Sequence, residues 1–568
     1  MLNASLSWQI VDWLSVSARV RVDNSTSDYS EKIYASSHSV ITEGSKNGLY
    51  GITTTKDRQQ YADVLVNVDK NFGESWSLHA NAGASFSNTS FDQLMVKGPI
   101  AEDALANFFT VWQLDKATTK REQAGWGEQT QSVFGSAEIG YKSTYYLTLT
   151  GRNDWPSQLA GPHSAQSSFF YPSVGASVVL SQIIPNMPAN LSYVKVRGSW
   201  ASVGLPFARF LANPTFEWVS SANAWSTESV YPLYNLKPER TDSWEVGLTM
   251  RFLKHFNLDL TYYNTRTYNQ TLDAQLSATS GYSKFYAQTG DVQNSGIELS
   301  LGFNKTWNKF SWESNYTFST NKNKIIDLID GYVHPLTGEV ITKDRLDVGG
   351  LSHARFLLKK GGSLGDLYSN ADLVRDSNGA IYVNEEGALN INGNADDIYL
   401  GSVFSKANMA WRNDFRIHNF NVGFLISARL GGVVYSATQA YLDSFGVSGV
   451  SADARDEGGV YINGSDRIDA QTWYQTIGSD SGVPQYYTYD ATNVRLQEAS
   501  IGYTIPRKKL GGVADMTLSL VGRNLWMIYN KAPFDPESTA STGNYYQGID
   551  YFMMPALRSF GFNVRLNF

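Results

Sequence analysis

The sequence predicts an all-β protein built as a transmembrane antiparallel β-barrel, and two observations support this fold class. Segments such as 14–23 and 243–252 alternate apolar and polar residues, so each strand has one face for an apolar medium and one for a polar medium. Turns of a few residues and loops of roughly 15 to 80 residues follow each other in strict alternation, as expected of a barrel with short periplasmic turns and long extracellular loops. A soluble sandwich would show the first pattern, but it has no reason to keep its long loops at one end.

Composition agrees with this fold class. Hydrophobic residues make up 42% of the 568 residues, and the mean hydropathy is −0.29. No run of about 18 apolar residues is present for a membrane helix, whereas a barrel keeps its mean hydropathy low because lipid-facing and lumen-facing residues alternate. The absence of cysteine excludes disulfides and thiol chemistry. A net charge of −7 with scattered basic residues argues against a nucleic-acid partner.

The alternation predicts about 17 strands, several of them long enough for a tilted membrane crossing. The expected ranges are 2–10, 13–23, 61–70, 75–88, 131–141, 145–154, 171–181, 192–203, 242–252, 257–270, 293–304, 309–321, 402–412, 417–430, 494–505, 515–527 and 557–568. Segments 24–60, 89–130, 322–401 and 431–493 are among the expected long loops, and 413–416 is among the expected short turns.

Aromatic residues flank the expected short turns. Six pairs do so: Trp8 and Trp13, Phe72 and Trp76, Tyr141 and Tyr145, Phe252 and Phe256, Trp307 and Phe310, and Trp411 and Phe415. Ordinary core aromatics near strand ends would explain any one pair. The recurrence at one set of strand ends favours an aromatic girdle at a membrane interface.

An odd number of strands has a structural consequence. Single-chain bacterial barrels use even numbers, and an open sheet leaves unpaired edges that lipid does not tolerate. The first residues, Met1–Trp8, lack the basic start and apolar core of a signal peptide. We therefore expect residues 1–568 to be the C-terminal part of a larger barrel, or a barrel closed by a separate chain.

The last segment is an amphipathic strand that ends on an aromatic residue. Its apolar positions are Phe560, Phe562, Val564, Leu566 and Phe568. This pattern resembles the sorting signal that the bacterial barrel-assembly machinery recognises. An ordinary edge strand that happens to end the chain is the alternative.

Six motifs between residues 150 and 568 point to one family. They are Asn153–Trp155 with Ser168–Val174, Leu236–Gly247, Asn294–Glu298, Gly361–Tyr368, Asn493–Pro506, and Gly522–Leu525 with Phe534–Glu537. In this order they resemble the SusC/RagA family of TonB-dependent outer-membrane transporters from Bacteroidetes-type bacteria.

Three of these motifs also have a physical interpretation. Pro238 cannot donate to a ladder and marks the passage from a loop into a strand. Gly296 permits a close approach or a bulge where a strand begins. The alternation slips by one residue at Gln497-Glu498, which predicts a β-bulge.

The resemblance implies a 22-stranded barrel in the bacterial outer membrane with an N-terminal plug in its lumen, a TonB-binding segment before the plug and a SusD-like surface lipoprotein as lid. The sequence departs from this pattern because the plug, the TonB box and roughly the first five strands are not in it. The implied TonB complex would therefore act through a region that is absent here.

No catalytic constellation, phosphate-binding loop or metal-ligand spacing occurs, so the sequence predicts neither an enzyme nor a cofactor or metal site. Asp376–Gly379 loosely resembles the start of a calcium loop but lacks the distal Glu, and we expect a hairpin turn there. The acidic pairs Glu385-Glu386 and Asp396-Asp397 are expected to be solvated.

Two functions are compatible with these features. The first is an energised importer of oligosaccharides or oligopeptides, with ligand contacts from the loop aromatics Trp473, Tyr474, Tyr486, Tyr487, Tyr545 and Tyr546. Packing of loop against loop is the alternative role for each of these residues. The second function is a passive pore or an adhesin-like structural barrel. The choice between glycan and peptide stays open.

Overall fold

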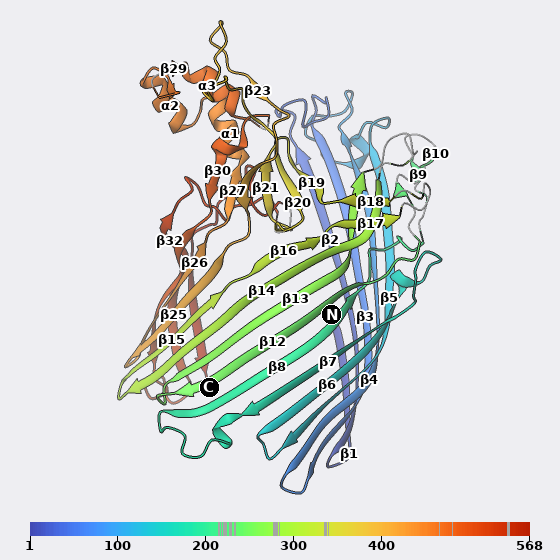
Figure 1. Cartoon of the computed structure of the whole chain (residues 1–568), viewed down its shortest axis with the longest axis vertical. Helices are drawn as coiled ribbons and strands as arrows, with labels where there is room; N and C mark the ends of the chain where they lie inside the picture. Colours follow the sequence, from blue (N-terminus) through green and yellow to red (C-terminus); the bar gives the residue numbers. More distant parts are fainter. Residues whose placement is uncertain are drawn as a thin grey trace. The chain divides into compact units, whose positions relative to one another are not determined.

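The computed structural model describes the chain except residues 214–215, 217, 220–223, 227–229, 232–233, 276–281, 283, 334–337, 339, 465, 480, 542 and 544–545. The described residues form two compact units: Met1–Ala176 with Ala201–Glu239, and Ser177–Trp200 with Arg240–Phe568. Both consist mainly of long antiparallel strands (Figure 1). Among the described residues, no helix is both long and apolar enough to span a membrane.

The first unit is a sheet of neighbouring strands joined in sequence order. Its strands are β1 (Leu2–Val11), β2 (Leu14–Ile33), β3 (Leu49–Phe72), β4 (Trp76–Pro99), β5 (Lys120–Tyr141), β6 (Tyr145–Pro156) and the start of β7 (Phe169–Val179). The short β9 (Trp218–Val219), β10 (Ala224–Trp225) and β11 (Val230–Tyr231) follow in the loop region. Each of β1 to β5 pairs antiparallel with the strand that follows it, and β3 and β4 stay in register over their full length.

The second unit continues the same design. Its long strands are β8 (Leu191–Leu205, up to Trp200), β12 (Glu239–Phe252), β13 (Phe256–Gln275), β14 (Lys284–Trp307), β15 (Phe310–Ser319), β25 (Ala407–Ile417), β26 (Phe420–Leu430), β31 (Asn493–Ile505), β32 (Asp515–Asn530) and β34 (Ser559–Asn567). From β12 to β34 each pairs antiparallel with the next in this order. β16 (Lys322–Asp327) pairs with the N-terminal half of β14.

The long loops of the second unit carry their own secondary structure. They contain β17 (Ile329–Val333), β18 (Val340–Lys343), β19 (Arg345–Leu351), β20 (Ala354–Lys359), β21 (Asp366–Ser369), β22 (Asp372–Leu373), β23 (Ile391–Asn392), β24 (Ile398–Ser402), β27 (Val433–Ser436), α1 (Ala437–Ser444), α2 (Gly449–Asp456), β28 (Val460–Ile462), β29 (Asp466–Ile468), α3 (Ala470–Ile477), β30 (Thr488–Asp490) and β33 (Ile549–Asp550). Figure 1 shows α1 to α3 gathered beyond the ends of β26 and β32.

The seventeen long strands match the predicted ones and confirm the all-β prediction. Strands β2 to β5 run much further than expected, into the predicted loops 24–60 and 89–130. Segments 24–28 of β2 and 54–58 of β3 are polar on both faces, as where Asn24 pairs with Arg58 and Thr26 with Lys56. Hydrophobic alternation cannot reveal such a strand, which is why the prediction ended too early there. The extension of β4 does carry apolar residues, including Leu94 and Val96, which the prediction left in a loop.

The predicted turn at 413–416 is wrong, and with it the pairing of Trp411 and Phe415 across a turn. Both aromatics lie within β25, and the turn is at His418 and Asn419, with His418 at a φ of 56°. Asn413 stays in the strand because the Trp312 Nε1–H donates to its Oδ1 at 3.0 Å. Asp414 also stays in the strand, because its Oδ2 forms an ion pair with Arg412 Nε at 2.7 Å. Asn413 and Asp414 are residue types that favour turns, but their side chains have partners within the sheet, so the backbone stays extended.

The predicted bulge at Gln497-Glu498 is confirmed, because the register of β31 shifts there against both of its neighbours. Pro238 directly precedes β12, as expected. Gly296 lies inside β14 and not at its start. It does mark a close approach, since a Cβ there would lie 2.0 Å from the Thr320 carbonyl oxygen.

One face of the sheet in the first unit is an apolar belt. The belt comprises Leu14, Val16, Ala18, Val20, Ala62, Val64, Val66, Val68, Ala80, Ala82, Ala84, Phe86, Val133, Ala137, Leu147 and Leu149. Its central side chains are open to the surroundings, with Val64 51% and Val133 55% exposed. A row of amides ends the belt, where the Asn88 Nδ2–H donates to Gln60 Oε1 at 3.3 Å.

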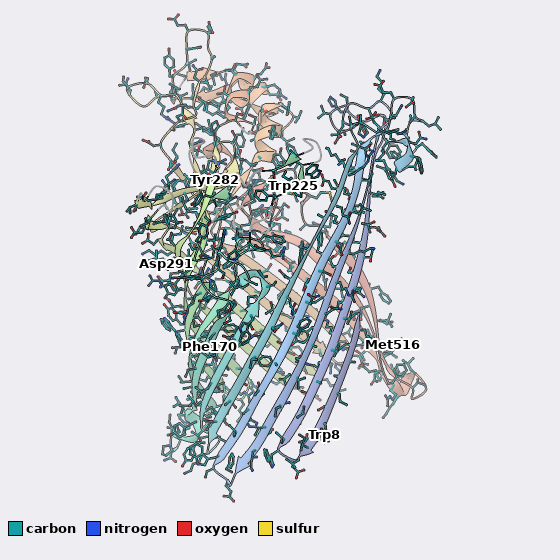
Figure 2. All side chains as sticks on the ribbon, turned by 90° about the vertical axis from the view of Figure 1, so that its right-hand side faces the viewer. Trp8, Phe170, Trp225, Tyr282, Asp291 and Met516 are labelled. Carbon is teal, nitrogen blue, oxygen red and sulfur yellow. The ribbon has the colours of Figure 1, made fainter. Side chains whose placement is uncertain are left out.

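The belt accounts for much of the height of a membrane. It covers seven residues of each of β2, β3 and β4, which at roughly 3.3 Å per residue and a tilt of about 40° spans about 15–18 Å, and the aromatics at the short turns add to this height. Aromatics lie at the short turns of each unit: Trp76 lies 4.6 Å from Tyr141 between ring centroids in the first unit, and Phe252 lies 5.2 Å from Phe256 in the second. Trp8 lies near the end of β1 in Figure 2. The predicted girdle therefore has a structural counterpart.

A charged residue placed in the belt tests this assignment. We expect Val64→Lys to destabilise the protein in lipid vesicles by about 2–4 kcal/mol, because an ammonium group would face hydrocarbon. Asn67→Lys, on the polar face of the same strand, should cost less than about 1 kcal/mol. Denaturant unfolding in vesicles gives both values, and equal costs would contradict the belt.

Candidate functional site

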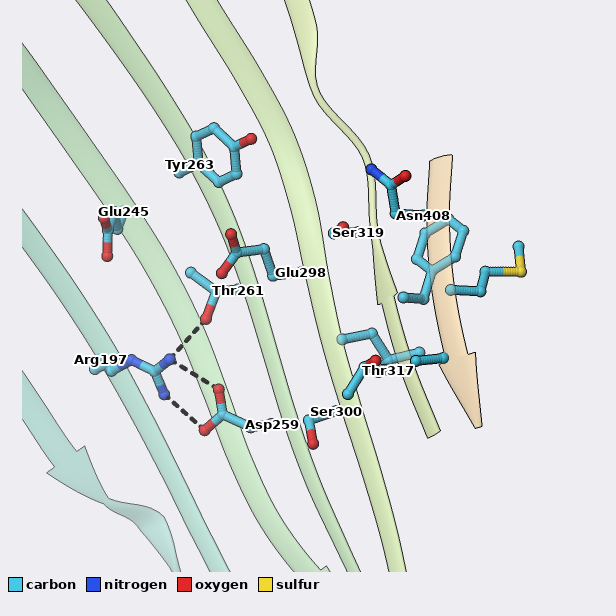
Figure 3. Close-up of a pocket in the computed structure, with 14 residues that line it drawn as sticks. Arg197, Glu245, Asp259, Thr261, Tyr263, Glu298, Ser300, Thr317, Ser319 and Asn408 are labelled. Carbon is cyan, nitrogen blue, oxygen red and sulfur yellow. Dashed lines mark hydrogen bonds and ion pairs between the residues drawn. The ribbon is translucent and has the colours of Figure 1, made fainter. Parts of the chain in front are cut away.

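A polar hollow of about 710 Å³ lies on the polar face of the second unit. Its wall is formed by residues of six strands, β8, β12, β13, β14, β15 and β25. Figure 3 shows their side chains converging from neighbouring strands. Its polar lining residues are Arg197, Glu245, Asp259, Thr261, Tyr263, Glu298, Ser300, Thr317, Ser319 and Asn408, and Leu299, Phe318, Met409 and Ala410 complete the lining.

An ion pair organises one side of this polar hollow. Arg197 Nη2 lies 2.9 Å from Asp259 Oδ1, and Arg197 Nη1 lies 3.1 Å from the other carboxylate oxygen, Oδ2. Arg197 also donates to the hydroxyl of Thr261 at 2.6 Å and of Thr249 at 3.0 Å. Such a two-pronged contact fixes the guanidinium plane against the wall.

Two glycines make room for the side chains that lie flat on this wall. A Cβ on Gly247 would lie 2.6 Å from the Arg197 guanidinium. A Cβ on Gly296 would lie 2.6 Å from the Tyr263 hydroxyl. Both glycines belong to motifs that the sequence analysis placed at strand starts, and the same motifs also shape the polar hollow.

The same two motifs supply the carboxylates of Glu245 and Glu298. Both line the polar hollow, and no hydrogen bond or ion pair joins either of them to another described residue, although Glu245 acts electrostatically on Arg197 and Glu298 on Tyr263. Carboxylates without a hydrogen-bond donor in a recessed wall attract cations or hydrogen-bond donors. Sequence reasoning missed this site, although the pairing of one Gly with one Glu in each motif was a usable signal.

Three of the predicted loop aromatics are buried. Trp473 is 7% exposed, Tyr474 9% and Tyr487 2%, and all three belong to one hydrophobic cluster that we call the loop core. Its other members include Phe356, Leu367, Val403, Tyr435, Ile477 and Ile549. Burial raises the pKa of the Tyr487 hydroxyl, because an ionised phenolate would lose its hydration there. These residues stabilise the loops by packing.

A helical pattern could have identified two of them. Ala470, Trp473, Tyr474 and Ile477 follow the spacing i, i+3, i+4, i+7 and form the buried face of α3. Asp469 caps this helix by accepting the Thr472 backbone N–H at 3.0 Å. The pattern predicts a packed helix face, a role that aromatic composition alone does not reveal.

Two of the nominated aromatics remain accessible. Tyr486 and Tyr546 are each 37% exposed. Each rests edge-on against a buried ring: Tyr486 on Trp473 with centroids 5.3 Å apart, and Tyr546 on Phe356 at 6.1 Å. Tyr545 lies outside the described residues. The structure thus leaves Tyr486 and Tyr546 as the described candidates with an exposed ring surface.

Arg345, Lys359 and Asp397 form an ion cluster in the loop region. Arg345 donates to both Asp397 oxygens at 2.7 and 2.8 Å, and Lys359 Nζ lies 3.0 Å away. These hydrogen bonds lower the pKa of the Asp397 carboxyl to about 2. The expectation that Asp396 and Asp397 are both solvated is therefore wrong for Asp397, whereas Asp396 is exposed.

The Asp376–Gly379 segment forms a turn, as expected. Asp376 Oδ1 accepts the backbone N–H of Asn378 at 2.8 Å and of Ala380 at 3.0 Å. The described residues contain no group of three or more His, Cys, Asp or Glu arranged to hold a metal ion.

The C-terminal segment forms β34, which pairs with β32 from Asn567 opposite Asp515 to Ser559 opposite Arg523. Its apolar residues are strongly exposed, with Phe560 at 79%, Phe562 at 64% and Phe568 at 82%. These side chains share one face of the strand, as a lipid-facing strand requires. Recognition by the assembly machinery stays a prediction.

Known proteins match the whole length of this chain. A family model described as "TonB dependent receptor-like, beta-barrel" matches residues 1–525. The chain belongs to this family. TonB-dependent receptor P26 of Formosa agariphila is 26% identical over 563 residues, which cover 92% of this chain and 54% of that protein. TonB-dependent receptor SusC of Bacteroides thetaiotaomicron is 22% identical over 477 residues, covering 79% of this chain and 45% of SusC.

Solved structures agree on the fold. The RagAB peptide transporter matches with a TM-score of 0.75 at 14% identity, covering 100% of this chain and 61% of that one. The siderophore receptor PiuA of Acinetobacter baumannii matches with a TM-score of 0.50 at 14% identity, covering 100% and 63%. The chain spans about half the length of the curated relatives that it matches.

The predicted SusC/RagA resemblance and the membrane barrel fold are thereby confirmed. The family places the chain in the bacterial outer membrane, so the apolar belt faces lipid and the polar hollow faces the lumen. A receptor family also agrees with the prediction that the chain is not an enzyme.

A double-mutant cycle tests the role of Gly247. We expect Gly247→Ala to push Arg197 away from Asp259 and to cost about 1 kcal/mol of unfolding free energy, because a methyl group would occupy the space of the guanidinium. In an Arg197→Ala background the same change should cost nearly nothing. Gly198→Ala is the matched control, since its Cβ has ordinary contacts. Equal costs in both backgrounds would contradict this packing.

The pKa of Asp397 predicts a pH dependence. Because its folded value of about 2 lies below the ordinary 3.8, the ion cluster stabilises the fold above about pH 4 and loses its contribution as the pH falls towards 2. Asp397→Asn should therefore lower stability by about 1 kcal/mol from pH 8 to pH 5, with the difference shrinking below pH 4. Thermal unfolding of both proteins across this range measures it. Asp396→Asn is the control, and a difference that disappears near pH 6 would refute the assignment.

Proposed function

We propose that this chain is the wall and mouth of a TonB-dependent nutrient importer of the SusC type. The observation that carries the proposal is the polar hollow, whose carboxylates Glu245 and Glu298 have no hydrogen-bond or ion-pair partner among the described residues. These carboxylates would be stabilised more by the basic groups of a domain docked against the wall than by water alone. The plug implied by the family resemblance would be such an occupant, and a plugged lumen requires energy to open.

The substrate class that we propose is an oligosaccharide or an oligopeptide. Exposed rings at Tyr486 and Tyr546, set among loop carboxylates and amides, offer stacking surfaces and hydrogen bonds to either class. One structural relative is described as a peptide transporter, and SusC is a sequence relative. A SusD-like lipoprotein as lid and the TonB complex as energy source belong to the same proposal.

A passive pore is the second candidate, because the polar lumen face would also suit a water-filled channel. Energy dependence separates the two functions. We expect cells carrying the complete transporter to accumulate a fluorescent oligosaccharide or oligopeptide pool, and to stop when the proton gradient is dissipated or TonB is deleted. Uptake that persists without TonB, with steady single-channel conductance, would support the pore instead.

The exposed loop aromatics provide a residue-level prediction. With whichever pool is taken up, Tyr486→Ala and Tyr546→Ala should each raise the half-saturation concentration about 5- to 30-fold, because each removes a stacking surface worth about 1–2 kcal/mol. Surface expression should stay unchanged. Trp473→Ala should instead destabilise the loop core by about 3–5 kcal/mol.

Tyr461→Ala is the matched control for these variants. Tyr461 is a loop tyrosine that is 61% exposed, and the Arg467 guanidinium lies 4.6 Å from its ring centroid. Unchanged uptake by the Tyr486 and Tyr546 variants would remove these rings from the ligand site. An equal defect in the Tyr461 variant would mean that the effect is not specific to them.

A further inference from the structure

A buried arginine on β31 holds the last long loop, residues 531–558. Arg495 Nη2 lies 3.0 Å from Asp535 Oδ1 and 3.2 Å from Glu537 Oε2. Only 6% of the Arg495 side chain is exposed, compared with 12% for Asp535 and 41% for Glu537. A buried guanidinium that lost these partners would carry a large desolvation cost, so the loop and the strand depend on each other.

Asn493 completes this contact from the same strand. Its Oδ1 accepts the Arg495 Nε–H at 3.2 Å, and its amide nitrogen donates to Glu537 Oε1 at 3.3 Å. The side chain of Asn493 is therefore a bridge between the arginine and the loop carboxylate. Arg429, directly opposite Asn493 on β26, adds a second positive charge beside this group.

Asp535 also ties the two ends of the loop together. Its Oδ1 accepts the backbone N–H of Glu537 at 3.1 Å, and its Oδ2 is 3.4 Å from the backbone nitrogen of Ala556. The outgoing and returning chain segments therefore meet at one carboxylate, which Arg495 holds. We call Asn493, Arg495, Asp535 and Glu537 the loop clamp.

Beyond the loop clamp, the loop joins the loop core. β33 pairs in parallel with β27 through Ile549 opposite Tyr435, and the Ser436 hydroxyl donates to Asp550 Oδ2 at 2.6 Å. Tyr546 lies just before this pairing and rests on Phe356. The accessible tyrosine thus sits between two attachment points, one on the barrel strand β31 and one on the loop core.

We infer that Arg495 is a positioning residue for transport: through the loop clamp it fixes the last loop, and thereby Tyr546, at the mouth of the barrel. This inference rests on the proposed importer function. It states that Arg495, which does not touch the ligand, sets the position of Tyr546, which does. An arginine suits the task because its planar fork reaches two carboxylates and Asn493 together. A lysine would keep the charge but lose the fork.

The first test needs no ligand and uses the complete transporter in native outer membranes. Residues 1–568 contain no cysteine, so Ser541→Cys introduces the one thiol of this part of the transporter, and any cysteine elsewhere in the complete protein would be replaced by Ser. With Arg495→Gln we expect thiol labelling by a maleimide to become at least about tenfold faster, because the loop opens more often. Arg495→Lys should give an intermediate rate. Unchanged labelling in Arg495→Gln would overturn the inference.

Arg523→Gln is the matched control for this test. Arg523 lies on the neighbouring strand β32, opposite Ser559, and pairs with Glu498 of β31 at 3.1 Å and not with a carboxylate of the loop. It loses the same charge, and we expect its labelling rate to equal that of the parent. Heat-modifiable electrophoretic mobility confirms in every variant that the barrel is folded. If Arg523→Gln accelerated labelling equally, a general effect of lumen charge would replace the loop clamp.

The second test separates positioning from stability. With the fluorescent pool taken up by the parent, Arg495→Gln should raise the half-saturation concentration about 5- to 30-fold while the maximal rate stays within about twofold, as expected when only the loop that carries Tyr546 is displaced. Arg495→Lys should recover part of the affinity. Faster labelling with unchanged half-saturation would overturn the transport role, and absence of uptake in the parent would instead overturn the proposed function.

Discussion

The structure depends on one constraint, that every backbone N–H and C=O group inside a bilayer must find its partner within the protein. Long antiparallel strands satisfy this requirement, as β3 and β4 do by pairing along their whole length. Once the backbone is paired, the alternation of side chains divides each strand into a lipid face and a lumen face. The apolar belt and the polar hollow are the two consequences of this single division.

Outside the membrane the constraint is relaxed, and the chain uses ordinary folding physics. The loops of the second unit bury Trp473, Tyr474 and Tyr487 in a loop core of their own, with helices capped by Ser436, Ser448 and Asp469. Arg495 links the last loop to a barrel strand by ionic contacts, beside a small apolar cluster that includes Phe534 and Tyr489. In loops organised in this way, Tyr486 and Tyr546 pack against buried rings of the loop core.

The sequence predicted the structure where apolar and polar side chains alternate with a period of two, and it failed where no such alternation exists. The belt strands, the bulge at Gln497-Glu498 and the close approach at Gly296 follow from alternation and from glycine sterics. The extensions of β2 and β3 around residues 24–28 and 54–58 escaped prediction because both of their faces are polar. Partners of Arg197 and Arg495 could not be predicted, since ion pairs between residues distant in sequence depend on strand register.

The division into a lipid face and a lumen face is tested most directly by a cysteine scan of β3 from residue 62 to residue 69, which the cysteine-free sequence permits. Each single cysteine in the complete protein would be probed in vesicles with a lipid-dissolved and a water-soluble thiol reagent. We predict that the even-numbered positions react with the lipid-dissolved reagent and the odd-numbered positions with the water-soluble one. Reactivity without this period of two would contradict the account.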